Sequence, residues 1–292
     1  MLNLNGSGVA LITPFNLDNT INYNKISQLI EYHIKNKTDF IVVCGTTGES
    51  ATLSLKEKKE LIRFVVEKVN KRIPVIAGTG SNNTSSAISL STYAKSVGVD
   101  GLLVVTPYYN KGNEEGIYMH YEKIANAVSP LPILLYNVPS RTSLNLKNDT
   151  ILSLAKIDNI IGIKEADTDI VKVSSLLFKL QRSNLDFKVF SGNDNLTLPI
   201  LLLGGSGVIS VCANIIPNQM HDICSNLDLE LYSKYYNLMN TLFIDVNPIM
   251  IKEAMNIIGM DVGTVRLPLY NTNKTNLSIL KNELETLNLI NN

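Results

Sequence analysis

A short apolar run that recurs eight times constrains the fold of this 292-residue chain more than any other feature of its sequence. Each run ends in a polar or glycine-rich loop, and apolar residues between the runs recur at the three- and four-residue spacing typical of helices. The runs cover residues 9–15, 40–45, 74–80, 101–107, 132–137, 160–166, 187–192 and 207–213. Strands that alternate with helices at intervals of roughly 20 to 35 residues predict an α/β fold, a parallel (β/α)₈ or TIM barrel.

An open, doubly wound sheet is the alternative architecture, and it would require a GxGxxG turn after the first strand. Residues 13–17, with the sequence TPFNL, are not such a turn. Beyond Cys224 only helical patterns remain. We therefore expect a barrel over residues 1–224 and a small, all-helical C-terminal domain over residues 225–292.

Two helix starts are marked in the sequence. Ser54 and Glu57 have the spacing of a capping box, in which each residue caps the other's backbone N–H. Asn247 is expected to cap a second helix over residues 249–260, with Pro248 at its first position.

Charge and hydropathy exclude several classes of function. The chain has 26 basic and 26 acidic residues, so neither nucleic acid nor an anionic membrane is an expected partner. No apolar run reaches the ~18 residues of a membrane span. The first six residues lack the basic and apolar regions of a signal peptide. We expect a cytoplasmic protein with no membrane partner.

The cysteines and histidines do not have the spacing of a metal site. The cysteines are odd in number and include no CxxC pair, so we expect buried thiols, not a zinc site or a disulfide, at Cys44, Cys212 and Cys224. HxH and HExxH patterns are also absent, which predicts surface or packing roles, and neither metal binding nor catalysis, for His33, His120 and His221.

The most informative run, residues 160–166, is apolar but contains Lys164 near its end. Because side chains alternate along a strand, we expect one face to carry Ile160, Gly162 and Lys164 and the other Ile161, Ile163 and Glu165. Burial disfavours the charged form of an amine, and a neutral amine can form a Schiff base with a carbonyl substrate. The alternative is a lysine that keeps its head in water or pairs with a carboxylate. Asp167 and Asp169 are expected to cap the next helix.

Chemically useful residues follow several of the other predicted strands. In a (β/α)₈ barrel the strand ends meet at one rim, so these residues should be neighbours. The loop 45–50, with the sequence GTTGES, suits a carboxylate, although glycine and threonine also make ordinary turns. Tyr136 is placed to pass protons to an imine, or else packs on a helix. Arg141 can clamp a carboxylate, or else lies in solvent.

Five motifs together resemble the pyruvate-dependent Schiff-base lyases, over nearly the whole chain. They are GTTGES at 45–50, TPYY at 106–109, YNVPSRT at 136–142, GIKEA at 162–166 and RLP at 266–268. The resemblance implies that pyruvate condenses with Lys164, becomes an enamine and attacks the aldehyde of L-aspartate 4-semialdehyde. This reaction is the first committed step of diaminopimelate and lysine synthesis. The covalent adduct on Lys164 would serve in place of a cofactor.

The resemblance also implies roles for individual residues. Tyr136, Thr46 and Tyr109 would form a proton relay, with Tyr109 reaching across from a neighbouring subunit of a homotetramer built from two tight dimers. The resemblance implies that Thr47 binds the pyruvate carboxylate and that Arg141 binds the carboxylate of the aldehyde. It also implies that the backbone of Gly192 and Ile209 contacts the substrates.

Two other functions are compatible with parts of this pattern. An aldolase of a sialic acid or a 2-keto sugar acid shares the lysine and the tyrosine. Arg141 and the paired Thr46 and Thr47 instead favour the condensation of pyruvate with L-aspartate 4-semialdehyde. A catalytically silent barrel that senses a keto acid is the other, and the joint presence of Lys164, Tyr136 and Arg141 argues against it.

Family members that are inhibited by lysine bind it at a subunit interface, with histidines after the GES segment and a glutamate on the following helix. The corresponding region of this chain comprises Ser50, Ala51, Leu55, Lys58, Asn82, Ser86 and Tyr108. Leu55, Lys58 and Ser86 replace the histidines and the glutamate, while Asn82 and Tyr108 remain. A cationic Lys58 and a missing carboxylate should repel the ligand's ammonium groups. We therefore predict weak or absent feedback inhibition by lysine.

Overall fold

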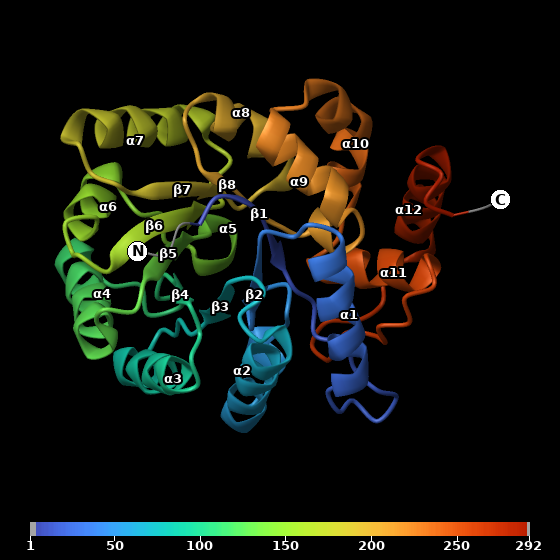
Figure 1. Cartoon of the computed structure of the whole chain (residues 1–292), viewed down its shortest axis with the longest axis horizontal. Helices are drawn as coiled ribbons and strands as arrows, with labels where there is room; N and C mark the ends of the chain where they lie inside the picture. The colour runs from blue at the N-terminus through green and yellow to red at the C-terminus, as the bar shows by residue number, and fades with distance from the viewer. Residues whose placement is uncertain (1–3, 291–292) are drawn as a thin grey trace.

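The computed structural model describes residues 4–290 and contains the predicted barrel. Residues 1–3 and 291–292 lie outside this range. The first six residues, which we predicted not to form a signal peptide, are therefore described only in part. Eight parallel strands follow one another around the barrel, and the last pairs with the first (Figure 1). They are β1 (Gly6–Ala10), β2 (Phe40–Val43), β3 (Val75–Gly78), β4 (Gly101–Val105), β5 (Ile133–Asn137), β6 (Ile160–Glu165), β7 (Lys188–Ser191) and β8 (Gly207–Ser210).

Helices surround the strands on the outside, as the α/β pattern requires (Figure 1). The ring consists of α1 (Tyr23–Lys35), α2 (Leu55–Val69), α3 (Thr84–Ser96), α4 (Glu114–Val128), α6 (Asn148–Leu154), α7 (Ile170–Ser183), α8 (Thr197–Leu202) and α9 (Pro217–Asn226). Short helical turns follow four strands, namely η1 (Ser50–Thr52), α5 (Pro139–Thr142), η2 (Asp194–Leu196) and η3 (Cys212–Asn214).

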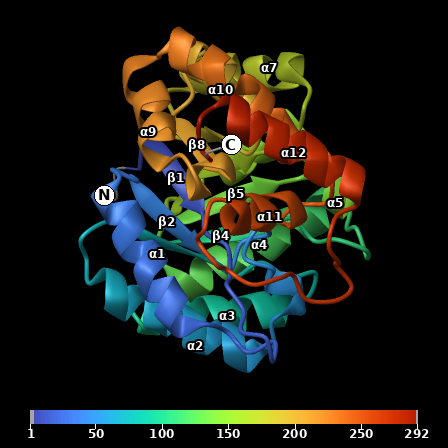
Figure 2. The ribbon, with the colours of Figure 1, turned by 90° about the vertical axis from the view of Figure 1, so that its right-hand side faces the viewer.

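The chain ends in helices alone, as predicted. These are α10 (Leu229–Thr241), α11 (Ile249–Ile257) and α12 (Lys274–Thr286). In Figure 2 the segment that carries α11 lies in front of the strands, with α12 beside it. Helix α9 packs on β1 and completes the ring before this extension begins. The division into domains at residue 224 stays a prediction.

The first strand begins and ends earlier than its apolar run suggested. It spans Gly6–Ala10, whereas the run covers residues 9–15. Leu11, Ile12 and Thr13 are nevertheless buried, because this loop packs beneath other segments. Ile12 donates its backbone N–H to Asn214, and Thr13 donates its hydroxyl to the carbonyl of Gly48. An apolar run reports burial and not strand pairing, so it overestimated the strand.

The alternation predicted for the lysine strand was wrong at its start. The register between β5 and β6 shifts, so that Ile133 pairs with Ile160 and Leu134 with Gly162. This irregularity turns Ile161 toward the cluster inside the barrel, while Ile163 belongs to the layer between strands and helices. Beyond the shift the alternation is regular. Lys164 lies opposite Tyr136.

The predicted helix caps at Ser54 and Asp169 are confirmed, and the predicted cap at Asp167 is corrected. Ser54 and Glu57 form both hydrogen bonds of the capping box. Asp169 caps α7 by accepting the N–H groups of its first turn. Asp167 is not a cap of that helix, because its carboxylate instead pairs with Lys172 at 3.1 Å.

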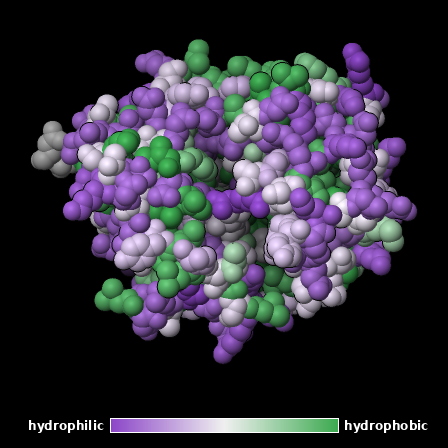
Figure 3. Space-filling model, turned by 180° about the vertical axis from the view of Figure 1, so that it is seen from behind, coloured by the Kyte–Doolittle hydropathy of each residue, from purple (hydrophilic) through white to green (hydrophobic). Residues whose placement is uncertain are grey.

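The thiols of Cys44, Cys212 and Cys224 are buried and free, as predicted. Burial raises the pKa of the Cys44 thiol to about 12, so the thiol is unreactive near neutral pH. No helix within residues 4–290 is long and apolar enough to cross a membrane. Polar and apolar side chains are interspersed over the face seen in Figure 3.

Each histidine contacts a hydroxyl or carboxylate side chain. His33 contacts the hydroxyl of Thr38 at 2.9 Å, and His120 contacts that of Thr84 at 2.9 Å. His221 lies 3.1 Å from the carboxylate of Asp39. Among the described residues, no cluster of three or more His, Cys, Asp or Glu side chains could hold a metal ion.

Stability should fall in acid because two histidines are buried in the neutral form. Desolvation lowers the pKa of His33 to about 3 and that of His120 to about 4, against about 6.5 in an unfolded chain. At pH values between the folded and unfolded pKa, the unfolded chain binds more protons than the folded chain does. The free energy of unfolding therefore decreases as the pH falls below about 6.5. His33 alone should contribute about 1.4 kcal/mol per pH unit.

Urea denaturation at a series of pH values from neutral to mildly acidic measures this slope. His33→Asn, which cannot titrate, should have a shallower slope than the parent chain, even if it is less stable at neutral pH. Equal slopes for the two proteins would contradict the assignment.

Candidate active site

Lys164 is buried where β6 ends, with 5% of its surface exposed. Its Nζ lies 4.8 Å from the centroid of the Tyr136 ring, which is 6% exposed and projects from the neighbouring strand β5. Within the described residues this nitrogen belongs to no ion pair. The alternatives of a solvated lysine or a paired one therefore do not describe Lys164. The buried amine faces the interior beside a phenol, as the Schiff-base interpretation requires.

Thr46 continues this arrangement. Its hydroxyl lies 3.5 Å from the hydroxyl of Tyr136, so a proton can be exchanged between them over a short movement. The loop that carries Thr46 follows β2 and is folded tightly: an added Cβ at Gly48 would come within 3.0 Å of the carbonyl of Leu11. Glycine lets this loop pack directly against the segment after β1.

Tyr109 does not join the relay within one chain. Its side chain is 90% exposed, and its backbone has a φ of 67°, in the left-handed region that bulky residues rarely adopt. Its role therefore depends on a neighbouring subunit and remains a prediction.

The two residues predicted to bind carboxylates are joined by Asn247. Its amide Nδ2 donates to the hydroxyl of Thr47 at 3.0 Å, and its backbone carbonyl accepts from the guanidinium of Arg141 at 2.9 Å. The prediction that Asn247 caps α11 was wrong. Pro248 occupies the cap position and α11 spans Ile249–Ile257, because the Asn247 side chain turns into the barrel end instead.

Of the predicted backbone contacts, Gly192 follows β7, which pairs with the lysine strand, and Ile209 lies in β8, the next strand around the barrel. Gly192 donates its N–H to the carbonyl of Glu165 at 2.7 Å. An added Cβ at Gly192 would meet the Cβ of Ala166 at 2.6 Å, so only glycine fits. Their contact with substrate remains a prediction.

A cavity of about 340 Å³ opens above these groups, and its lining includes Thr46, Tyr136, Arg141 and Asn247. Lys164 and Thr47 are not part of the lining. Four residues of the predicted lysine site, Ser50, Ala51, Lys58 and Tyr108, line the same cavity. Burial lowers the pKa of Lys58. Leu55, Asn82 and Ser86 do not line this cavity.

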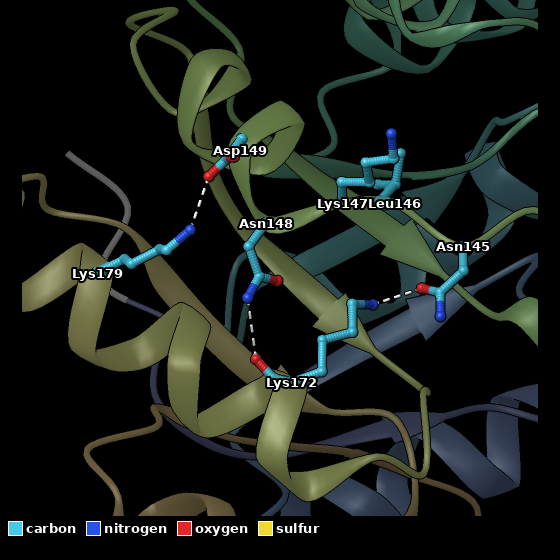
Figure 4. A pocket seen from close by; sticks show the side chains of 7 residues that line it. All are labelled: Asn145, Leu146, Lys147, Asn148, Asp149, Lys172 and Lys179. Atoms are coloured by element: carbon cyan, nitrogen blue, oxygen red, sulfur yellow. Dashed lines mark hydrogen bonds and ion pairs between the residues drawn. The ribbon is translucent and has the colours of Figure 1, made fainter.

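A second cavity, of about 360 Å³, is lined by residues of α6, of α7 and of the loop before α6 (Figure 4). Its three lysines, Lys147, Lys172 and Lys179, all pair with carboxylates, and Figure 4 shows Lys179 directed at Asp149, at 2.7 Å. The pairing leaves none of these lysines free to bind an anion.

Sequence reasoning missed a buried ion pair that fixes the threonine loop. Glu49 lies 2.6 Å from Lys252 of α11, and both side chains are almost fully buried. Lys252 also donates to the carbonyl of Thr264, and Glu49 accepts the N–H of Arg266. Desolvation lowers the pKa of Lys252 to about 8. The only sequence signal was a lysine within the apolar run of α11.

A second missed residue is Asp194, a buried carboxylate in the turn after β7. It accepts the backbone N–H groups of Val211 and Cys212 at 3.1 and 2.9 Å. Desolvation raises its pKa, while nearby Ser210, Lys164 and the two N–H groups oppose that shift. Asp194 thereby ties the ends of β7 and β8 together below the lysine.

A parallel barrel with a buried lysine beside a tyrosine at the strand ends defines a lyase or aldolase of the Schiff-base type. The chain belongs to the dihydrodipicolinate synthetase family, whose model matches residues 3–287.

Known proteins agree with this assignment over nearly the full length. The chain is 49% identical over 290 residues to 4-hydroxy-tetrahydrodipicolinate synthase of Clostridium novyi (strain NT), covering 97% of this chain and 96% of that protein. It is 50% identical over 293 residues to the enzyme of the same name from Clostridium tetani, with 98% of each chain covered. The crystal structure of chloride-inhibited dihydrodipicolinate synthase from Acinetobacter baumannii, complexed with pyruvate, matches with a TM-score of 0.95 at 42% identity, covering 99% and 100% of the two chains.

Proposed function

We propose that this chain is a lyase that condenses pyruvate with L-aspartate 4-semialdehyde to form 4-hydroxy-tetrahydrodipicolinate, the first committed step of diaminopimelate and lysine synthesis. The observation that carries the proposal is the buried amine of Lys164 beside Tyr136, in a chain about half identical to synthases of that name. The pyruvate complex of a structurally similar relative supports the first substrate.

The reaction follows from the chemistry of a buried amine. The Lys164 nitrogen attacks the ketone carbon of pyruvate, and water leaves to give a protonated imine. This cation draws electrons from the adjacent methyl group, which loses a proton and becomes the carbon nucleophile of an enamine. That carbon attacks the aldehyde carbon of the second substrate. The substrate's amino group then attacks the imine carbon, which closes the ring and frees Lys164.

The surrounding side chains supply protons and hold charge. Tyr136 and Thr46 lie within reach of each other and are proposed to carry protons to and from the imine and the new alcohol. Thr47 is proposed to bind the pyruvate carboxylate and Arg141 that of the aldehyde. The protonated imine is itself the electron sink, so the proposed mechanism uses neither a metal nor an organic cofactor.

Tyr109 completes the relay only if a second copy is present. Its exposure in a single chain and its unusual backbone conformation support a place in an interface. We propose an assembly of two tight dimers in which each Tyr109 serves the site of its neighbour. The buried, free thiols are compatible with the cytoplasm as its location.

The proposal is tested by mixing the chain with pyruvate and one aldehyde at a time. L-Aspartate 4-semialdehyde should be consumed together with pyruvate, whereas the aldehydes released by sialic acid and 2-keto sugar acid aldolases should not. Faster consumption of a sugar aldehyde would instead identify a sugar-acid aldolase. Failure to consume any aldehyde would favour the silent keto-acid sensor.

Replacing Arg141 by alanine should impair the second substrate more than the first. The guanidinium is held by the Asn247 carbonyl at the wall of a cavity that Lys164 does not line. We expect kcat/KM for the aldehyde to fall about 10- to 100-fold, as for a lost hydrogen bond to a charged group, while pyruvate adduct formation changes far less. Arg182→Ala, on the exposed end of α7, is the matched control. Equal losses for both substrates would contradict the role.

L-Lysine should inhibit weakly or not at all. Lys58 places a cation on the cavity lining, and Ser86, an exposed residue of α3, supplies no carboxylate for the ligand. Initial rates with and without millimolar L-lysine test this expectation. The double variant Lys58→His, Ser86→Glu should become more sensitive than the parent chain. Halving of the parent's rate would refute the prediction.

A further inference from the structure

Asn247 has a buried acceptor that the contacts described above leave unused. The residue is 6% exposed and lines the cavity. Its Nδ2 and backbone carbonyl are engaged by Thr47 and Arg141, but its side-chain oxygen Oδ1 has no hydrogen-bond partner in the structure. A buried polar oxygen without a partner is costly, and such an oxygen in a binding cavity is available to a ligand.

The charges around the cavity select the ligand group that this oxygen can take. Arg141 and Lys58 contribute cations to the lining, so they attract carboxylates and not an ammonium group. The carboxylate of Glu49 is already paired with Lys252 at 2.6 Å and accepts the N–H of Arg266 at 2.9 Å. Oδ1 of Asn247 is an unpaired acceptor on the residue whose backbone carbonyl accepts from the Arg141 guanidinium.

We propose that Asn247 Oδ1 accepts a hydrogen bond from the α-amino group of the aldehyde substrate and so selects a 2-amino aldehyde acid. The inference rests on the proposed function and deepens it. The amino group and the carboxylate of that substrate share one carbon atom. A carboxylate bound by Arg141, whose NH2 group contacts the Asn247 carbonyl, brings the amino group to the same residue.

A neutral amide suits the chemistry better than a carboxylate would. The amino group has to lose a proton before it can close the ring, and a neighbouring negative charge would hold it protonated. The amide oxygen accepts the hydrogen bond without adding that charge. Meanwhile Nδ2 donates to the oxygen of Thr47, which leaves the Thr47 hydroxyl proton for the pyruvate carboxylate.

The test compares L-aspartate 4-semialdehyde with 4-oxobutanoate, the same aldehyde acid without the amino group. For each protein the discrimination is the kcat/KM of the first compound multiplied by the inhibition constant of the second, which competes with it. Damage to Thr47 or Arg141 lowers kcat/KM and raises the inhibition constant, so its effects on their product largely cancel. Loss of the contact with the amino group lowers only kcat/KM, because 4-oxobutanoate has no amino group. Asn247→Ala should lower the discrimination about 10-fold or more. Asn145→Ala, which changes an asparagine of the second cavity, is the matched control.

Asn247→Asp keeps an oxygen acceptor but adds the negative charge that holds the amino group protonated, so the KM of the aldehyde should stay near the parent's while kcat falls. A discrimination in Asn247→Ala within twofold of the parent's would overturn the inference. If the alanine variant does not fold, a KM for the aldehyde raised about 10-fold in Asn247→Asp would overturn it instead. Failure of the parent chain to form a pyruvate adduct, or to condense the aldehyde, would count against the proposed function and not against the role of Asn247 alone.

Discussion

Lys164→Ala is expected to lose turnover by a factor on the order of 10⁴ or more, because the variant has no amine with which to form the imine. The loss should be in kcat at saturating concentrations of both substrates. The variant should still fold, since it removes a buried amine that belongs to no ion pair within the described residues.

Two controls make this result specific. Lys156→Ala, on an exposed turn after α6, should behave as the parent chain does. A circular dichroism spectrum and a denaturation curve establish that Lys164→Ala is folded. A folded variant that retained a tenth of the parent's turnover would show that the reaction does not pass through an imine on this residue.

Tyr136→Phe is expected to slow turnover by roughly 10² or more, because it removes the hydroxyl that faces Thr46 but keeps the ring beside Lys164. The retained ring should preserve packing and the burial of the amine. Thr46→Val, which interrupts the same relay one group further out, should have a smaller effect in the same direction.

Tyr93→Phe is the matched control, because that hydroxyl donates to the carbonyl of Lys59 on the outside of the barrel. Its turnover should equal that of the parent. Pre-steady-state formation of the adduct separates proton transfer from substrate binding. A Tyr136→Phe chain within a few-fold of the parent would remove Tyr136 from the relay.

The barrel and the position of Lys164 could be predicted because both depend on local patterns. Apolar runs separated by helical spacing define eight strands, and the known geometry of such barrels then places the residues after each strand at one rim. Tyr136 and Thr46 were brought together in this way although they are 90 positions apart. The irregularity before Gly162 was missed because it depends on pairing with β5, which an apolar run does not encode.

The contribution of the C-terminal extension could not be predicted from local patterns. Asn247 bonds to Thr47 from 200 positions away, and its sequence context fits a helix cap equally well. Lys252 and Glu49 are joined only once α11 has packed over the barrel end. The motifs identified the residues that touch the substrates, whereas tertiary packing determines how those residues are held.

Reduction with borohydride in the presence of pyruvate tests the central claim most directly. The chain should gain the mass of one reduced pyruvyl group, and peptide mapping should place that mass on Lys164. Chain treated with borohydride alone should be unmodified. An unmodified Lys164, or an adduct carried by another lysine such as Lys252, would contradict the account.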